Sequence, residues 1–209
     1  VIGGNNKFIT AKDGPLELKK TKKKFFSLNQ EQLKALKFLE KSNNKFDVSV
    51  LQGTTGSGKT LVYFERIKKI IENKNQALVL LPEIFLTNDF KSRFEDFFGF
   101  QPAIWHSKIT PKQKRIIWKG LIRDKIKILV GARSALLLPF KKLGIIIVDE
   151  EHDASYKQDE GVIYNARDMA ISRAFFENIP VHLVSSIPSI ETYNTVSYTH
   201  LTLPTNREV

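Results

Sequence analysis

The sequence has no cysteine, a single methionine and two tryptophans among 209 residues. The absence of cysteine excludes disulfide bonds and cysteine-ligated zinc within this chain, and it is compatible with a reducing compartment. No apolar run approaches the roughly 20 residues that a membrane helix requires, and the first residues are not typical of a secretory signal. We therefore expect a cytoplasmic protein with no membrane partner. The chain also lacks an initial methionine, so we expect it to begin within a longer protein.

The sequence is basic, with a formal net charge of +11. Lysine and arginine side chains that neutralise phosphates release condensed counterions, so this charge is compatible with a nucleic-acid partner. The alternative is a generally lysine-rich composition, because much of the excess lies in Lys19-Lys20 and Lys22-Lys23-Lys24. Charge alone leaves both interpretations open.

The pattern along the chain predicts one main domain over residues 25–195. Residues 1–24 are polar and rich in glycine and lysine, and we interpret them as a linker or the end of a preceding domain. Further on, unbroken apolar runs alternate with helical patterns, as in parallel strands covered on both faces. This order predicts an α/β fold with a doubly wound, mainly parallel sheet and helices on both faces. The predicted strands are 48–52, 77–81, 103–105, 126–130, 145–148 and 181–185; the predicted helices are one capped by Asn29 and those near 59–72, 88–98, 111–124 and 166–176.

A complete phosphate-binding loop (P-loop) follows the first predicted strand. Its glycines let backbone N–H groups approach phosphate closely, and the start of the next helix adds a favourable positive potential. In this motif the lysine, Lys59, contacts the β- and γ-phosphates, and the hydroxyl of Thr60 binds Mg²⁺. The expected nucleotide-binding residues are Gly53, Thr54, Thr55, Gly56, Ser57, Gly58, Lys59 and Thr60.

Acidic residues at the end of a later apolar strand complete the expected chemistry. Asp149 and Glu150 follow Ile145-Ile146-Ile147-Val148, and doubly wound sheets place their ligands at this end of their strands. We expect Asp149 to hold Mg²⁺ and Glu150 to act as a general base toward water, with Lys59 as the third catalytic residue. Several strand–helix units separate Lys59 from Asp149, which favours a RecA-like lobe over a small GTPase. The tryptophans Trp105 and Trp118 are expected to lie in the core.

Further segments carry a family resemblance. Residues 149–158 read Asp-Glu-Glu-His-Asp-Ala-Ser-Tyr-Lys-Gln, and residues 164–168 read Tyr-Asn-Ala-Arg-Asp. With Leu81-Pro82-Glu83-Ile84 and Gly131-Ala132-Arg133-Ser134-Ala135, their order and spacing resemble the bacterial replication-restart DNA helicases of superfamily 2, the PriA (primosomal protein N′) family. The resemblance covers about residues 28–195.

The resemblance implies roles that the residues alone do not show. Gln32 is similar to the family's adenine-recognising residue, and the loop from Ser155 to Tyr164 resembles an aromatic-rich loop that couples DNA contact to hydrolysis. Tyr156 in this loop would stack on a base; its alternative role is ordinary packing under the loop. The expected DNA-binding residues are Pro82, Thr87, Arg133, Ser134, Tyr156 and Lys157.

The chain departs from the family pattern at two points. Val162 replaces an aromatic residue after Glu160-Gly161, which weakens a stacking role there. The segment that usually reads Gly-Ser-Ala-Thr-Pro reads Val184-Ser185-Ser186-Ile187-Pro188, so Ser185 or Ser186 must replace the threonine hydroxyl if either does. The last residues, 196–209, resemble a reading frame of a transposase adapter used in sequencing, and we expect them to be non-native.

The resemblance implies the first, ATP-binding lobe of a 3′-to-5′ DNA helicase in replication fork restart and primosome assembly. It implies ATP and Mg²⁺ as cofactors, with zinc only in a C-terminal half that this chain lacks. The implied partners are single-stranded and forked DNA, primosome proteins and single-stranded-DNA-binding protein. Because a second lobe supplies the arginine finger of such motors, we expect this fragment to be inactive in unwinding alone. The alternatives are another superfamily 2 translocase and a non-motor ATP-binding domain.

Overall fold

The computed structural model describes residues 26–42, 45–190, 192 and 200–203, so the predicted linker 1–24 lies outside the described residues. Within these ranges the main sheet has seven strands in the order β3-β4-β2-β5-β8-β1-β9, and every pair in it is parallel. A second, antiparallel pair is formed by β6 and β7. The strands are β1 (Asp47–Gly53), β2 (Gln76–Leu80), β3 (Ala103–Trp105), β4 (Ile128–Gly131), β5 (Leu143–Asp149), β6 (Lys157–Gln158), β7 (Tyr164–Asn165), β8 (Pro180–Ser185) and β9 (His200–Leu203).

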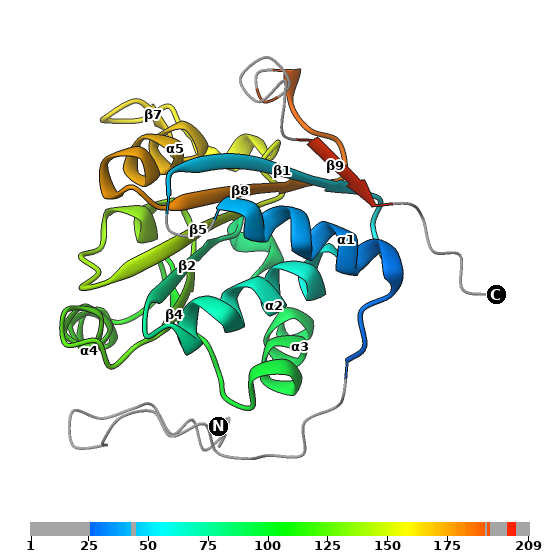
Figure 1. Cartoon of the computed structure of the whole chain (residues 1–209). Coiled ribbons are helices and arrows are strands. Elements are labelled where there is room, and N and C mark those ends of the chain that lie inside the picture. The colour runs from blue at the N-terminus through cyan, green and yellow to red at the C-terminus, as the bar shows by residue number, and fades with distance from the viewer. Residues whose placement is uncertain (1–25, 43–44, 191, 193–199, 204–209) are drawn as a thin grey trace.

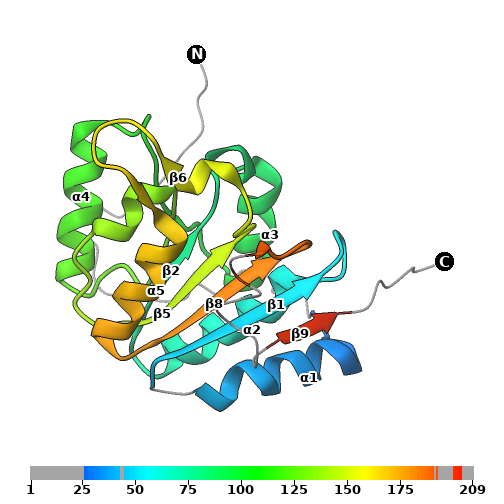
Figure 2. The ribbon, with the colours of Figure 1, turned by 90° about the horizontal axis from the view of Figure 1, so that it is seen from above.

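Helices cover both faces of the sheet, as predicted (Figures 1 and 2). Helices α1, α2 and α3 contribute to the hydrophobic core on one face. Helices α4 and α5 contribute to the core on the other face. The helices are α1 (Gln30–Leu39), α2 (Lys59–Glu72), α3 (Asn88–Phe98), α4 (Pro111–Ile122) and α5 (Ala166–Glu177), with short 3₁₀ helices η1 (Glu40–Ser42), η2 (Glu83–Phe85), η3 (Arg133–Leu137) and η4 (Ala154–Tyr156).

The central strands are buried along their whole length, which explains their unbroken apolar sequences. Every residue of β2, β5 and β8 is buried. Successive side chains point to opposite faces of a strand, so Ala77 and Val79 join one core while Leu78 and Leu80 join the other. A strand with two apolar environments needs apolar residues at every position.

The strand order gathers the sequence motifs at one edge of the sheet. The P-loop follows β1, and β5 ends at Asp149. The segments expected to bind DNA follow β2 and β4, which lie on the other side of β5 from β1. Because parallel strands end at the same edge, nucleotide motifs and DNA segments become neighbours, with β5 between them.

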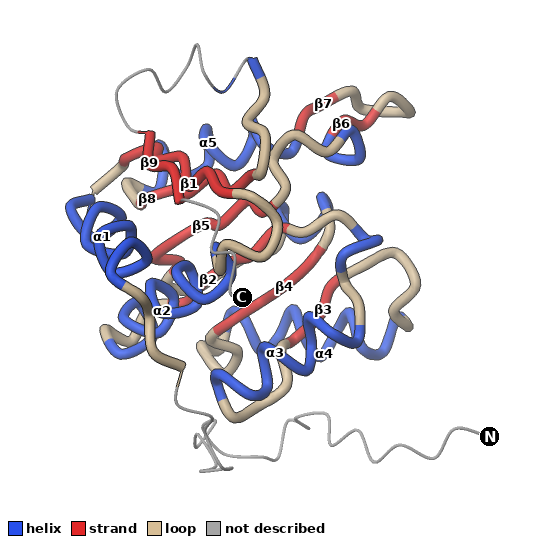
Figure 3. The backbone as a smooth tube through the Cα atoms, turned by 90° about the vertical axis from the view of Figure 1, so that its right-hand side faces the viewer, coloured by secondary structure: helices blue, strands red, loops and turns tan. Residues whose placement is uncertain are grey.

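Three features differ from the expectations. The β6–β7 ribbon, which stands away from the main sheet in Figure 3, has no counterpart among the predicted strands. Trp118 is 50% exposed, so its prediction as a core residue is wrong: on α4 the buried positions are Ile117 and Leu121, and Trp118 lies beside that face. Trp105 is half-buried at the edge strand β3.

Residues beyond the predicted lobe add one strand. His200–Leu203 pair in parallel with Val50–Gly53 of β1. The rest of segment 196–209 lies outside the described residues. This pairing places β9 along the edge of the sheet beside β1. The derivation of residues 196–209 from a sequencing adapter stays a prediction.

Candidate nucleotide and nucleic-acid site

The P-loop has the backbone that its glycines permit. Gly56 and Gly58 both have φ of +84°, a left-handed conformation that residues with a Cβ rarely adopt. A Cβ on Gly58 would lie 2.2 Å from the Nε2 atom of Gln32, whereas one on Gly56 would meet nothing within 4 Å. Gly58 is therefore required both by its conformation and by the approach of α1 to the loop.

The side chains of the loop present groups suited to phosphate. The ammonium of Lys59 is buried and donates to the carbonyl oxygens of Gly53, at 2.5 Å, and Thr54, at 3.1 Å. The hydroxyl of Ser57 is buried without a hydrogen-bond partner. A positive charge and an unsatisfied hydroxyl in one loop at a helix N-terminus fit the phosphates of a nucleotide.

Asp149 is a buried acidic residue at the end of β5. Its Oδ2 accepts a hydrogen bond from the phenol of Tyr63 at 2.9 Å, and its Oδ1 accepts one from the backbone N–H of Glu150 at 3.0 Å. Burial raises the pKa of Asp149 to about 6, against the opposing effect of the Tyr63 hydrogen bond. The carboxyl is thus predominantly ionised at pH 7, the form that a cation requires.

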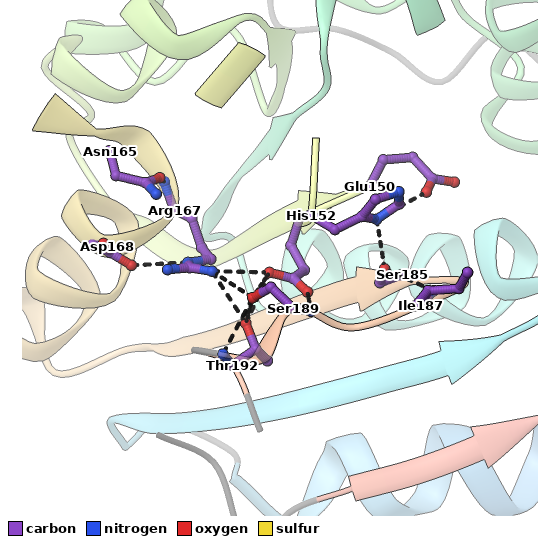
Figure 4. Close-up of polar contacts among 10 residues, drawn as sticks. Glu150, His152, Asn165, Arg167, Asp168, Ser185, Ile187, Ser189 and Thr192 are labelled. Carbon is purple, nitrogen blue, oxygen red and sulfur yellow. Dashed lines mark hydrogen bonds and ion pairs between the residues drawn. The ribbon is translucent and has the colours of Figure 1, made fainter. Parts of the chain in front are cut away.

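Glu150 and His152 lie at the turn after β5. Glu150 has a φ of +49°, an uncommon conformation for a residue with a side chain and one often found at functional sites. The Nδ1 atom of His152 is 2.7 Å from the Oγ of Ser185 and 3.7 Å from a carboxylate oxygen of Glu150. Ser185 therefore supplies the hydroxyl next to the acidic turn, while Ile187 offers none (Figure 4).

Glu151 joins the acidic turn to two other segments, the stretch after β8 and helix α5. Its carboxylate accepts hydrogen bonds from the backbone N–H of Ser189 and the hydroxyl of Thr192, both at 2.8 Å. The guanidinium of Arg167 on α5 lies 3.4 Å from the same carboxylate and donates to the Oγ of Ser189 at 2.6 Å. The contacts fix the segment after β8 against the turn that carries Asp149 and Glu150.

Gln32 contacts the P-loop through the backbone of the loop. Its Nε2 donates to the carbonyl of Ser57 at 3.0 Å, and its Oε1 accepts from the backbone N–H of Asn29 in a capping box. Both ends of the side-chain amide are thus engaged by the protein. A role in adenine recognition stays a prediction.

Three of the expected DNA-binding residues line one pocket of about 230 Å³. Pro82, after β2, and Arg133, after β4, lie on its wall together with Tyr156. Arg133 donates a hydrogen bond to the carbonyl oxygen of Lys157, whose own side chain is exposed. The structure therefore brings together residues from three separate segments.

Two further expected DNA-binding residues, Thr87 and Ser134, follow the pocket residues closely in the sequence. Each of them forms a hydrogen bond within the protein. Thr87 is exposed and accepts from the backbone N–H of Phe90, capping α3. The Oγ of Ser134 accepts from the indole N–H of Trp105 at 3.0 Å. Neither contact tests a DNA-binding role.

The expected base-stacking role of Tyr156 requires a correction. The side chain is only 1% exposed, and its phenol donates to the carbonyl of Asp149 at 2.6 Å and lies 3.0 Å from that of Leu80. The ring thus packs under the loop, the alternative interpretation of the sequence. Two carbonyl acceptors at neighbouring strand ends hold the phenol inward, where no base can stack on the ring in this conformation.

Sequence reasoning missed Tyr63, Glu151 and Arg167 as parts of the site. A signal exists for Tyr63, because it lies three residues after Thr60 on the helix that the P-loop opens, and residues at this spacing share a face. Arg167 lies within the Tyr-Asn-Ala-Arg-Asp segment that carried the family resemblance. The partners of these residues are distant in sequence, so their contacts could not be anticipated.

The fold and the site define a nucleotide-binding lobe of RecA-like type, in which a P-loop after β1 and acidic residues after β5 lie at one edge of the sheet, with β8 between the two strands. A protein-family model described as DEAD/DEAH box helicase matches residues 29–191. The chain belongs to this family. A domain of this helicase family implies that the chain binds a nucleotide together with a metal ion.

The predicted resemblance to replication-restart helicases is confirmed by curated relatives. The chain is 48% identical over 168 residues to the replication restart protein PriA of Rickettsia felis, covering 80% of this chain and 26% of that protein. It is 43% identical over 151 residues to the protein of the same name from Bacillus subtilis, covering 72% of this chain and 19% of that protein. The chain thus spans about a quarter or less of the length of these relatives.

Solved structures support the fold. RecG bound to a three-way DNA junction superposes with a TM-score of 0.60 at 22% identity, covering 86% of this chain and 27% of that one. The Hef helicase domain from Pyrococcus furiosus gives a TM-score of 0.59 at 16% identity, covering 84% of this chain and 39% of that one. Among the described residues, no helix is both long and apolar enough to cross a membrane.

Proposed function

We propose that this chain is the ATP-binding lobe of a DNA helicase that acts in replication fork restart. The observation that carries the proposal is the arrangement of two motifs at one edge of the sheet: the P-loop after β1, which opens α2 at Lys59, and Asp149 at the end of β5. The PriA relatives support the process, and the DNA-bound RecG structure supports DNA as the polymer.

Each residue of the site has a distinct part in the proposed hydrolysis. Lys59 and the backbone N–H groups from Gly53 to Gly58 would bind the phosphates of ATP. Mg²⁺, when bound, neutralises phosphate charge, and Thr60 and Asp149 are the residues that would hold it. Glu150 would accept the proton of the attacking water. In the described ranges no three His, Cys, Asp or Glu side chains cluster as a metal cage, and Mg²⁺ typically takes its remaining ligands from phosphates and water.

The DNA side of the proposal rests on the other half of the same edge. Single-stranded DNA would lie over the pocket between Pro82 and Arg133, with Thr87, Ser134 and Lys157 as neighbouring contacts to the phosphates. We further propose forked DNA as substrate, 3′-to-5′ movement, and primosome proteins and single-stranded-DNA-binding protein as partners. Residues 1–24 would be a linker or the end of a preceding domain, and residues 196–209 an adapter-derived tail.

The nucleotide proposal is tested by titrating the purified chain with a fluorescent ATP analogue in Mg²⁺. We expect saturable binding that Lys59→Ala weakens at least tenfold, because the substitution removes the charge that faces the phosphates. Lys34→Ala is the matched control, since Lys34 is exposed on α1 and forms a surface ion pair with Glu31. Equal affinity of the wild type and Lys59→Ala would exclude the P-loop as the binding site.

A second measurement tests the DNA part and the expected limit of the fragment. Because the arginine finger of such motors comes from a second lobe, the chain alone should not unwind a forked duplex. Single-stranded DNA should still bind, and more weakly after Arg133→Ala. Unwinding by the 209-residue chain would contradict the proposed incompleteness.

A further inference from the structure

Tyr63 is a fully buried residue of α2 whose polar group points at the candidate metal site. Its ring packs edge-on against Phe64, with centroids 5.2 Å apart, in the core between α2 and the sheet. Its hydroxyl donates to Oδ2 of Asp149 at 2.9 Å, across 86 residues of sequence. A phenol in this position is held by packing and has one orientation toward the acid.

Tyr63 also belongs to the helix that the P-loop opens. It lies three residues after Thr60 on α2, and residues at this spacing share a face of the helix. The phenol therefore links the helix that follows the P-loop to the acidic end of β5.

The contact fixes one of the side chains that would hold Mg²⁺, the carboxylate of Asp149. Both oxygens of Asp149 have a donor, Oδ2 from Tyr63 and Oδ1 from the backbone N–H of Glu150, so the plane of the carboxylate is fixed. In metal sites, residues that hydrogen-bond to the metal-binding side chains set the orientation of those side chains.

We propose that Tyr63 is a positioning residue that holds Asp149 in the orientation required for binding Mg²⁺ with the nucleotide. The inference rests on the proposed nucleotide-binding function and adds a residue to it. Tyr63 is fully buried and acts through Asp149.

The substitution Tyr63→Phe tests this role because it removes only the hydroxyl and keeps the packed ring. The affinity of Mn²⁺ for the complex of the chain with a non-hydrolysable ATP analogue is measured by electron paramagnetic resonance. Nucleotide affinity is measured separately in EDTA. We expect Mn²⁺ affinity to fall about tenfold, as for other outer contacts of metal ligands, while nucleotide affinity in EDTA changes less than about twofold.

The matched control is Ser49→Ala, which also removes a buried hydroxyl bound to a carboxylate. Ser49 lies on β1 and donates to Oδ2 of Asp47 at 2.7 Å, at the strand end away from the P-loop. It should leave both affinities unchanged.

The outcomes separate this inference from the proposed function. Wild-type chain that binds no nucleotide would refute the proposed function. Normal nucleotide binding with equal Mn²⁺ affinity in wild type and Tyr63→Phe would overturn the positioning role alone. Loss of nucleotide affinity in EDTA, or a large drop in thermal stability, would assign Tyr63 a structural role and would also overturn it.

Discussion

At the scale of single residues, the buried acids Asp149 and Glu151 have different partners and different tasks. Asp149 is held by a neutral phenol and a backbone N–H, with Lys59 near enough to lower its pKa. Glu151 has no exposed side-chain surface and is neutralised by Arg167, so its charge is used within the protein. The carboxylate of Asp149 is thus available to a cation, whereas the carboxylate of Glu151, two residues further on, fixes the surrounding segments.

Replacement of Glu151 by alanine should strongly destabilise the fold. The change leaves the buried guanidinium of Arg167 without its buried partner and the hydroxyl of Thr192 without its acceptor. Removing one member of a buried ion pair costs about 3–5 kcal/mol. Urea unfolding measures the effect, and Asp168→Ala is the control, because Asp168 pairs with the same arginine from an exposed position and should cost only about 0–1 kcal/mol. Equal losses in the two variants would argue against the buried network.

At the scale of elements, α2 and α3 are joined through aromatic rings. Phe64 of α2 lies 5.2–6.0 Å, between ring centroids, from four phenylalanines of α3: Phe90, Phe94, Phe97 and Phe98. Edge-on and tilted contacts of this kind stabilise beyond the burial of area. Because α2 is the helix that the P-loop opens, the same cluster supports the phosphate-binding loop.

Phe64→Ala should therefore lower the free energy of unfolding by about 3–5 kcal/mol through the cavity that it leaves. Phe176→Ala is the matched control, since Phe176 is 83% exposed on α5 and should change stability by less than about 0.5 kcal/mol. Urea denaturation of both variants measures the difference. A small effect of Phe64→Ala would mean that α3 is not packed on α2 as described.

At the scale of the whole molecule, two buried titratable groups give the stability opposite dependences on pH. Burial and the charge of Arg66 lower the pKa of His182 from its ordinary 6.5 to about 3, so the unfolded chain binds more protons between these values. Stability from this residue falls as the pH decreases from about 6.5 to 3. Asp149, whose pKa is raised to about 6, acts in the opposite direction between about pH 4 and 6.

The difference between wild type and His182→Val isolates the histidine. Stability of the wild type relative to the variant should fall by up to about 1.4 kcal/mol per pH unit below pH 6.5, because one proton is bound on unfolding. Urea unfolding between pH 7 and 5 provides the measurement. A difference that does not vary with pH would show that the fold does not lower the pKa of His182.

Much of the fold followed from the sequence because its signals are local. All six strands predicted within residues 25–195 are present, with ends shifted by at most about two residues at 126–130, where β4 is Ile128–Gly131. The N-cap of α1 at Asn29 and the P-loop at the end of β1 were equally predictable from the sequence. Apolar runs, caps and glycine-rich turns act within a few residues, so they are visible without the fold.

Sequence alone determined the fold class, the phosphate loop and the acids that face it, since spacing within one segment fixes each of these. The tertiary structure decided which side chains meet. It turned the phenol of Tyr156 inward and Trp118 outward, joined Tyr63 to Asp149, and placed Arg167 against Glu151. These outcomes depend on strand order and helix packing between residues far apart in the chain. A residue's periodicity can show that it is near the core, but its partners are set only when distant segments come into contact.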